Sequence, residues 1–189
     1  MTTAGSFLER LVGLLDAAST PYMVAGSFAS TYHGVPRTTQ DIDIVVEFTP
    51  TSLKRLLNLL PEDDYYVSDT AAADALRRRG QFNVIDLETG WKADLIVRKQ
   101  RQFSIEEFAR RQTAVLEGVS VFLASPEDTV LAKLEWAKNS GSERQLRDVA
   151  GVLHVMGSRL DSEYLARWAA TLELEELLVR ARGLDPASI

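Results

Sequence analysis

The chain has 189 residues, of which 46% are hydrophobic and 25% charged, and this composition is that of a globular protein with one core or a core and a small appended lobe. It contains no cysteine, which excludes disulfides, thiolate metal ligands and a cysteine nucleophile. Its two histidines argue against a histidine-rich zinc site. The formal net charge of −6 argues against coating nucleic acid through overall charge, although it leaves room for a local basic groove.

The first twenty residues have the apolar spacing of an amphipathic helix. No basic leader precedes them, and Glu9, Arg10 and Asp16 interrupt the apolar positions, which is unlike a signal peptide. No apolar run approaches the length of a membrane span. We therefore expect a cytoplasmic protein without a membrane segment.

Residues 1–124 mix helical and strand patterns. Asp41–Glu47 is rich in β-branched residues, Pro50 opens a helix in its first turn, and residues 88–91 join two strands as a hairpin. In chain order we expect a helix over 6–18, a strand over 22–25, a short helix over 28–34, a loop over 35–40, a strand over 41–47, helices over 50–60 and 69–79, strands over 82–87 and 92–97, a helix near 104–111, and a strand pair within 113–123.

The pattern changes at residue 125. Ser125 as N-cap, Pro126 at the first helical position and acids in the first turn predict a helix start. Helices are then expected over about 126–139, 142–155, 161–171 and 173–182. The sequence thus predicts an α/β (α+β) lobe over 1–124, with a mixed β-sheet flanked by helices, and a small C-terminal helical bundle over 125–189 packed on it.

Asp41 and Asp43 are the first candidates for chemistry. On a strand, residues i and i+2 point to the same face, about 6.6 Å apart. Two carboxylates this close repel each other unless a cation lies between them, and oxygen ligands select hard ions such as Mg²⁺ or Mn²⁺. The triplet alone also fits a strand edge that carries two solvated acids.

The surrounding sequence favours the metal site. Upstream, Gly26-Ser27 lies between a strand and a helix, where backbone N–H groups can bind a phosphate. Downstream, Asp94 lies in a second strand and reaches the metals if that strand neighbours the first. A phosphate cradle, a paired carboxylate and a third carboxylate are the parts of a two-metal transfer site.

These blocks resemble the signature of the nucleotidyltransferase superfamily related to DNA polymerase β, a Gly-Ser pair followed by Asp-x-Asp. Thirteen residues separate Ser27 from Asp41 here. The version Arg37-Thr38-Thr39-Gln40-Asp41-Ile42-Asp43 is similar to the bacterial AbiEii-like toxin group and its uncharacterised relatives. That group also carries a Lys-x-Asp motif, which Lys92 and Asp94 match. In its helical lobe the group has a lysine and an Arg/Lys-Asp pair, to which Lys133 and Arg147-Asp148 correspond.

The resemblance implies transfer of a nucleoside monophosphate from a nucleoside triphosphate (NTP) to a hydroxyl of RNA, protein or a small molecule, with release of pyrophosphate. It implies that Asp41 and Asp43 bind two Mg²⁺ or Mn²⁺ ions, and that Asp94 completes the second ion's ligands and acts as the base. The residues it assigns to the phosphates are Gly26, Ser27, Arg37, Lys92 and Lys133. It further implies a toxin with an antitoxin partner.

Two other interpretations remain open. A non-catalytic relative that binds nucleotide or a partner, such as an antitoxin or regulatory subunit, agrees with the acidic charge and with an incomplete terminal motif: Arg147-Asp148 is present, but the first arginine and the last acid of the AbiEii-type motif are not. A doubly wound phospho-acceptor regulator is the third, and the consecutive helices after residue 124 speak against it.

Basic residues cluster at 77–79, 98–101, 110–111 and 144–147. Each cluster is best explained as a solvated face, and together they give slight support for RNA. The sequence selects neither the NTP, nor the acceptor, nor the oligomeric state.

Overall fold

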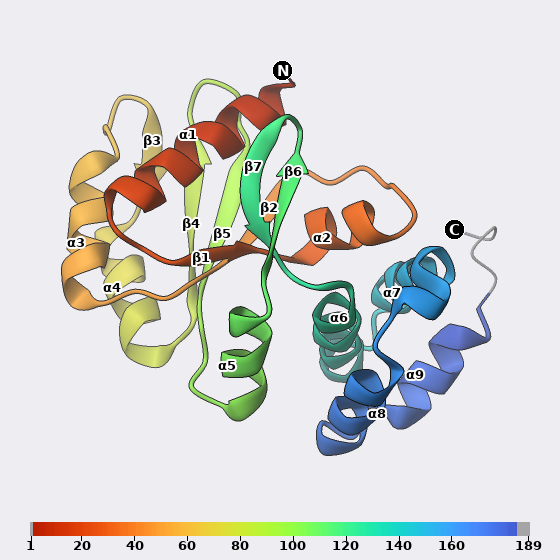
Figure 1. The fold of residues 1–189 in the computed structure, drawn as a ribbon. Helices are drawn as coiled ribbons and strands as arrows, with labels where there is room; N and C mark the ends of the chain where they lie inside the picture. Colours follow the sequence, from red (N-terminus) through yellow and green to blue (C-terminus); the bar gives the residue numbers. More distant parts are fainter. Residues whose placement is uncertain (1, 185–189) are drawn as a thin grey trace. The chain divides into compact units, whose positions relative to one another are not determined.

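The computed structural model describes residues 2–184, which form two compact units (Figure 1). The first unit contains residues up to Ala25 and Thr39–Leu123, and the second contains Gly26–Thr38 and the chain from Ala124 onward. No helix among the described residues is long and apolar enough to cross a membrane.

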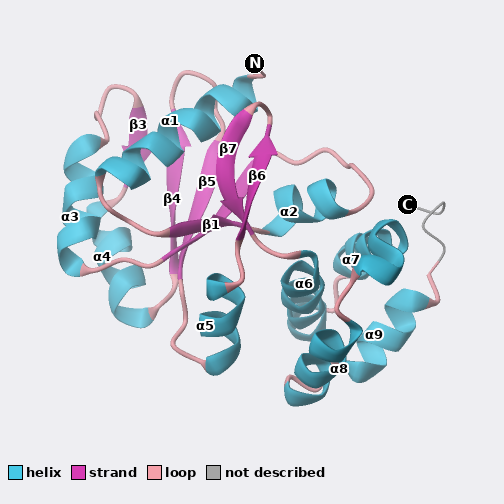
Figure 2. Ribbon diagram, in the orientation of Figure 1, coloured by secondary structure: helices cyan, strands magenta, loops and turns pink. Residues whose placement is uncertain are grey.

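The first unit is built on a mixed sheet of seven strands in the order β3-β4-β5-β2-β1-β7-β6 (Figure 2). The pairs β2–β5 and β1–β7 are parallel and the other neighbours are antiparallel. Its strands are β1 (Tyr22–Val24), β2 (Asp41–Val46), β3 (Tyr65–Val67), β4 (Gln81–Asp86), β5 (Lys92–Val97), β6 (Gln112–Leu116) and β7 (Val119–Leu123). Its helices are α1 (Thr3–Ala17), α3 (Pro50–Leu59), α4 (Asp69–Arg78) and α5 (Gln102–Ala109).

One face of this sheet is apolar and carries the core. Alternate residues of the central strands are fully buried, among them Ile42, Ile44 and Leu95. Helices α1, α3 and α4 form the layer on this face, and Arg10 of α1 donates a hydrogen bond of 2.8 Å to the buried Asp86 of β4. Because successive strand residues point to opposite faces, the residues between the buried ones lie on the opposite face, which is polar where β2 and β5 begin.

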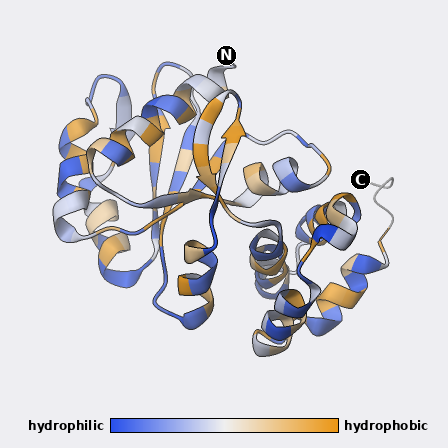
Figure 3. Cartoon of the chain, viewed as in Figure 1, coloured by the Kyte–Doolittle hydropathy of each residue, from blue (hydrophilic) through white to orange (hydrophobic). Residues whose placement is uncertain are grey.

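The second unit is helical, and its helices show polar and apolar stretches side by side (Figure 3). They are α2 (Gly26–His33), α6 (Pro126–Ser140), α7 (Glu143–Met156), α8 (Ser162–Thr171) and α9 (Glu175–Arg182), with a 3-10 turn at Gly157–Arg159. Helix α2 packs on α6 and α7. The His33 ring is buried, with Nε2 2.8 Å from the carbonyl oxygen of Ala124.

Gly34 brings the end of α2 close to α7. A Cβ atom at this position would lie 2.7 Å from the backbone nitrogen of Val152 and 2.9 Å from the carbonyl carbon of Gly151. Both neighbours are backbone atoms that cannot swing away. Only glycine therefore lets the loop after α2 lie directly against α7.

The expected elements are largely confirmed, including the mixed sheet, the 82–97 hairpin, the strand pair within 112–123 and the consecutive helices after residue 125. Strand β3 was not expected, because it is a partly buried strand at the edge of the sheet, whereas the equally short β1 is buried throughout and forms an apolar run in the sequence. Residues 26–38 pack with the helical unit, whereas the sequence placed all of 1–124 in one lobe. The cause is non-local, since the Gly34 packing depends on α7.

Candidate active site

Asp43 and Asp94 are opposite each other in the parallel pair β2–β5, and Asp41 is opposite Lys92. Neighbouring strands lie about 4.8 Å apart, so the four side chains start close together on the polar face of the sheet. The buried Ile42 and Ile44 hold this register, because a slip of one residue would turn them toward solvent. The strand pairing on which the inclusion of Asp94 depended is confirmed.

Lys92 bridges two of the aspartates. Its Nζ lies 3.3 Å from Oδ1 of Asp41 and 3.3 Å from Oδ1 of Asp94. Burial alone would lower the pKa of Lys92, but the charge and hydrogen bonds of Asp94, and then of Asp41, outweigh it and raise that pKa above its usual value. These ion pairs are partly exposed and each contributes at most about 1 kcal/mol to stability. The ammonium therefore acts mainly as a local counter-charge to the carboxylates.

Asn83 was not expected at the site from the sequence. It lies opposite Asp94 in the antiparallel pair β4–β5, and its Nδ2 donates a hydrogen bond to Asp94 Oδ1. Part of the signal was present in the two predicted strands of the hairpin. Pairing them through the expected turn at 88–91 would have placed Ile85 beside Asp94, whereas the observed register is shifted by two residues and pairs Asn83 with Asp94.

The metal assignment of Asp41, Asp43 and Asp94 stays a prediction. Among the described residues, no group of three or more His, Cys, Asp or Glu side chains is arranged so that it could hold a metal ion. The donor chemistry nevertheless fits Mg²⁺ or Mn²⁺, because carboxylate oxygens are the ligands these ions prefer. The Lys92 ammonium also shows that a cation is held between Asp41 and Asp94.

A second polar cluster lies within the helical unit and contains Arg37. Its Nε and Nη2 donate to the two carboxylate oxygens of Asp148, at 2.8 and 3.0 Å, and Nη2 also donates to Ser27 Oγ at 2.5 Å. Lys133 Nζ donates to Asp148 Oδ2 at 2.6 Å and to Gln145 Oε1 at 3.0 Å. Helices α2, α6 and α7 and the loop after α2 thus each supply one part of the cluster.

Burial gives this cluster its electrostatic character. The side chains of Lys133 and Asp148 are each 5% exposed. Desolvation would raise the pKa of Asp148, but the Arg37 hydrogen bonds and the Lys133 charge outweigh it and lower that pKa. The single carboxylate of Asp148 thus accepts hydrogen bonds from two cations, Arg37 and Lys133.

Gly26 opens α2 directly after the strand β1. Its φ of 57° is in the left-handed region, which glycine adopts without the cost that a side chain would add. The N–H groups at the start of a helix attract anions, and the neighbouring Ser27 already contacts Arg37. In the helical unit, Arg37 and Lys133 therefore both bind Asp148, and Arg37 also binds Ser27. Gly26 precedes Ser27 in the chain.

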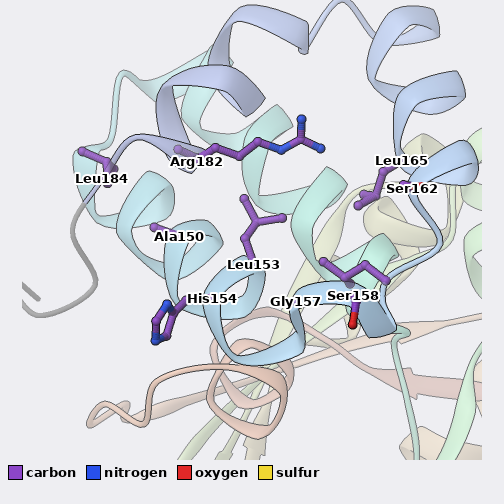
Figure 4. Close-up of a pocket in the computed structure, with 11 residues that line it drawn as sticks. Ala150, Leu153, His154, Gly157, Ser158, Ser162, Leu165, Arg182 and Leu184 are labelled. Carbon is purple, nitrogen blue, oxygen red and sulfur yellow. The ribbon is translucent and has the colours of Figure 1, made fainter.

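A cavity of about 520 Å³ lies elsewhere in the helical unit, as Figure 4 shows. Residues of α7, α8 and α9 line it, among them Leu153, Leu165 and Arg182. None of its described lining residues is a predicted site residue. Its size alone therefore does not make it the candidate site.

Comparisons with known proteins define the fold. No family model matches the chain, and no curated protein matches it in sequence. Among solved structures it is similar to ANT(2'')-Ia in complex with adenylyl-2''-tobramycin, with a TM-score of 0.61 and 15% identity over 93% of this chain and 99% of that one.

Two further structures give similar values. An antigenic nucleotidyltransferase-like protein from Paracoccidioides brasiliensis has a TM-score of 0.56 at 19% identity, covering 92% of this chain and 91% of its own. The lincosamide antibiotic adenylyltransferase LnuA, bound to lincomycin, has a TM-score of 0.53 at 11% identity, covering 82% and 98%. The chain has the nucleotidyltransferase fold, which confirms the fold class predicted from the sequence. The closer resemblance to the AbiEii-like group stays a prediction.

Proposed function

We propose that this chain is a metal-dependent nucleotidyltransferase that moves a nucleoside monophosphate from an NTP to an acceptor hydroxyl and releases pyrophosphate. The observation that carries the proposal is the register of β2 and β5, which places Asp43 opposite Asp94 on the polar face of a sheet with the nucleotidyltransferase fold. Two structures of similar fold, the lincosamide antibiotic adenylyltransferase LnuA and ANT(2'')-Ia in complex with adenylyl-2''-tobramycin, support a reaction of this class.

The carboxylates have two tasks in this proposal. Asp41, Asp43 and Asp94 hold Mg²⁺ or Mn²⁺, which when bound supplies positive charge near the α-phosphate. Asp94 also accepts the proton of the acceptor hydroxyl. The acceptor oxygen then bonds to the α-phosphorus, and the bond from that phosphorus to the bridging oxygen breaks, so that pyrophosphate leaves. Asn83 fixes the orientation of Asp94 through its hydrogen bond.

The remaining predicted residues bind phosphate oxygens in the proposal. Gly26 offers a backbone N–H and Ser27 a hydroxyl, and Arg37, Lys92 and Lys133 offer positive charge. Asp148 orients Arg37 and Lys133, because both donate to its carboxylate.

The biological role is a finer proposal. The AbiEii-like resemblance supports a cytoplasmic toxin with an antitoxin partner and an RNA or protein acceptor. A second candidate is a non-catalytic nucleotide-binding relative, an antitoxin or regulatory subunit. The observation that favours it is the Lys92 ammonium, which already forms ion pairs with both Asp41 and Asp94.

Radiolabel transfer tests the first proposal against the second. The chain is incubated with each α-³²P-labelled NTP, Mg²⁺ or Mn²⁺, and total RNA or protein. We expect label on an acceptor with the parent chain and none with Asp43→Asn, while the exposed Asp63→Asn control keeps activity. Triphosphate binding without transfer to any acceptor supports the non-catalytic relative, and equal transfer by Asp43→Asn contradicts the site.

A further inference from the structure

The fold brings together two basic stretches that are separate in the sequence. Helix α4 ends in Arg77 and Arg78, and the chain continues through Arg79 into β4. In the β4–β5 register Gln81 is opposite Ile96, and Val97 N donates to Gly80 O at 2.9 Å. The end of α4 therefore lies beside the end of β5, in the part of the first unit between the labels α4 and α5 in Figure 1.

A direct hydrogen bond joins the two stretches. Arg79 Nη1 donates to the backbone carbonyl of Arg98 at 2.7 Å. Arg79 itself has a left-handed backbone, with φ 52° and ψ 46°. A side chain makes this conformation sterically unfavourable, so the surrounding contacts must hold it there. This hydrogen bond thus links the two basic stretches.

The resulting basic surface consists of Arg77, Arg78, Arg79 and Lys99. Ion pairs neutralise it only in part, since Arg77 and Arg78 share the single carboxylate of Asp74. Arg79 donates to a neutral carbonyl, which leaves its charge in place. Four cations therefore face one carboxylate, in a chain whose net charge is −6.

Helix stabilisation explains only part of this surface. Cations at a helix C-terminus interact favourably with the helix dipole, which accounts for Arg77 and Arg78. It does not account for Lys99, which follows a strand and is exposed. Guanidinium groups match phosphate geometry, and cations spread over two elements fit a run of phosphates better than a single anion.

We propose that this basic surface binds the phosphate backbone of RNA. Lys99 is five residues beyond Asp94 along the chain, about 16 Å at the rise of an extended strand, so the surface would contact phosphates away from the reacting hydroxyl. The inference rests on the proposed function in one respect: RNA is the acceptor only if the chain transfers a nucleotidyl group.

The test measures RNA binding without NTP or metal. A fluorescein-labelled single-stranded RNA of twenty nucleotides is titrated with the parent chain, with R77A/R78A/K99A, and with R144A/R159A/R180A. The second triple variant removes the same charge from exposed positions in the helical unit. Anisotropy is followed from 50 to 200 mM salt, and circular dichroism checks that both variants are folded.

We expect the R77A/R78A/K99A variant to bind RNA at least about tenfold more weakly. The slope of the logarithm of the binding constant against the logarithm of the salt concentration should become smaller by about 2, since each phosphate contact on single strands contributes about 0.7 to that slope. The control variant should stay within twofold of the parent. No micromolar binding by the parent, or equal losses in both variants, would overturn the proposal. So would equal displacement of the RNA by polyglutamate, which would indicate an acidic protein partner.

The two proposals can fail separately. If R77A/R78A/K99A loses RNA binding but the parent chain uses no NTP, the RNA-binding surface is supported and the proposed nucleotidyl transfer is contradicted. Nucleotidyl transfer by a chain whose basic surface does not bind RNA would overturn the surface alone.

Discussion

Asp43 and Asp94 are register partners in the parallel strands β2 and β5, and Asn83 of β4 donates a hydrogen bond to Asp94 from the other side. Three adjacent strands thus each place one polar side chain in the same row of the sheet. The buried residues between them on the opposite face fix that row.

Replacing Asp94 should affect chemistry more than nucleotide binding. We expect Asp94→Asn to lower kcat by about 10²- to 10⁴-fold, the usual contribution of a positioned base, with a smaller change in the KM for NTP. Steady-state transfer assays measure both constants. An unchanged kcat would remove Asp94 from the reaction, whatever its position in the sheet.

Asn83 should act as a positioning residue. Asn83→Ala removes the hydrogen bond to Asp94 and should lower kcat about tenfold while the KM for NTP stays within twofold, because a displaced reacting group costs rate rather than binding. Asn83→Ser, which can still donate, should recover part of the rate. The control is Gln81→Ala, an exposed residue of the same strand. Equal effects of Asn83→Ala and Gln81→Ala would show that the strand surface, and not this hydrogen bond, matters.

Asp148 should stabilise the helical unit. Asp148→Ala leaves Arg37 and the buried Lys133 without their carboxylate, and breaking such a pair costs about 3–5 kcal/mol of unfolding free energy. Urea unfolding at pH 7 measures this loss. The exposed Asp63→Ala serves as control and should change it by less than about 0.5 kcal/mol.

The same residue should give a pH dependence of stability. Because the folded state lowers the pKa of Asp148, its contribution is present above the unfolded pKa of about 3.9 and is lost as pH falls through the lower folded value. Asp148→Asn should make the free energy of unfolding less dependent on pH in this acid range. A dependence as steep as that of the parent would contradict the predicted direction of the pKa shift.

Gly34 should be intolerant of a side chain. Gly34→Ala places a Cβ 2.7 Å from a backbone nitrogen of α7, and we expect a loss of about 1–3 kcal/mol from overpacking. Gly13 in α1 is a matched control, because a Cβ there meets nothing within 4 Å, and Gly13→Ala should stabilise the helix by about 0.5–1 kcal/mol. Thermal unfolding of both variants tests the contrast, which equal melting temperatures would refute.

Local chemistry in the sequence predicted most of the elements. The cap and proline at Ser125-Pro126 begin α6 as expected, with Ser125 Oγ accepting from Asp128 N, and the β-branched run after Asp41 forms β2. These signals are carried by neighbouring residues. Strand β3 escaped prediction because it is only partly buried at the edge of the sheet and depends on pairing with β4.

The candidate site was predictable in part. The carboxylates and Lys92 were predicted from strand spacing and from the resemblance, and their register is now visible. The hydrogen bond of Asn83 was not predictable, because it depends on the register of the β4–β5 hairpin. The burial of Lys133 and the packing of 26–38 on α7 were not predictable either, because both depend on residues distant in sequence. Sequence spacing identifies candidate ligands, but strand pairing and helix packing determine their neighbours.

Direct metal binding tests the central claim most closely. Mn²⁺ is titrated by electron paramagnetic resonance into the parent chain, Asp43→Asn and the exposed control Asp63→Asn, each with a non-hydrolysable NTP analogue present. The account predicts Mn²⁺ binding by the parent and the control, and an affinity at least about tenfold lower for Asp43→Asn, the size of loss that removing part of a metal site causes. Equal affinity in all three chains would contradict the assignment of Asp41, Asp43 and Asp94 as the metal site.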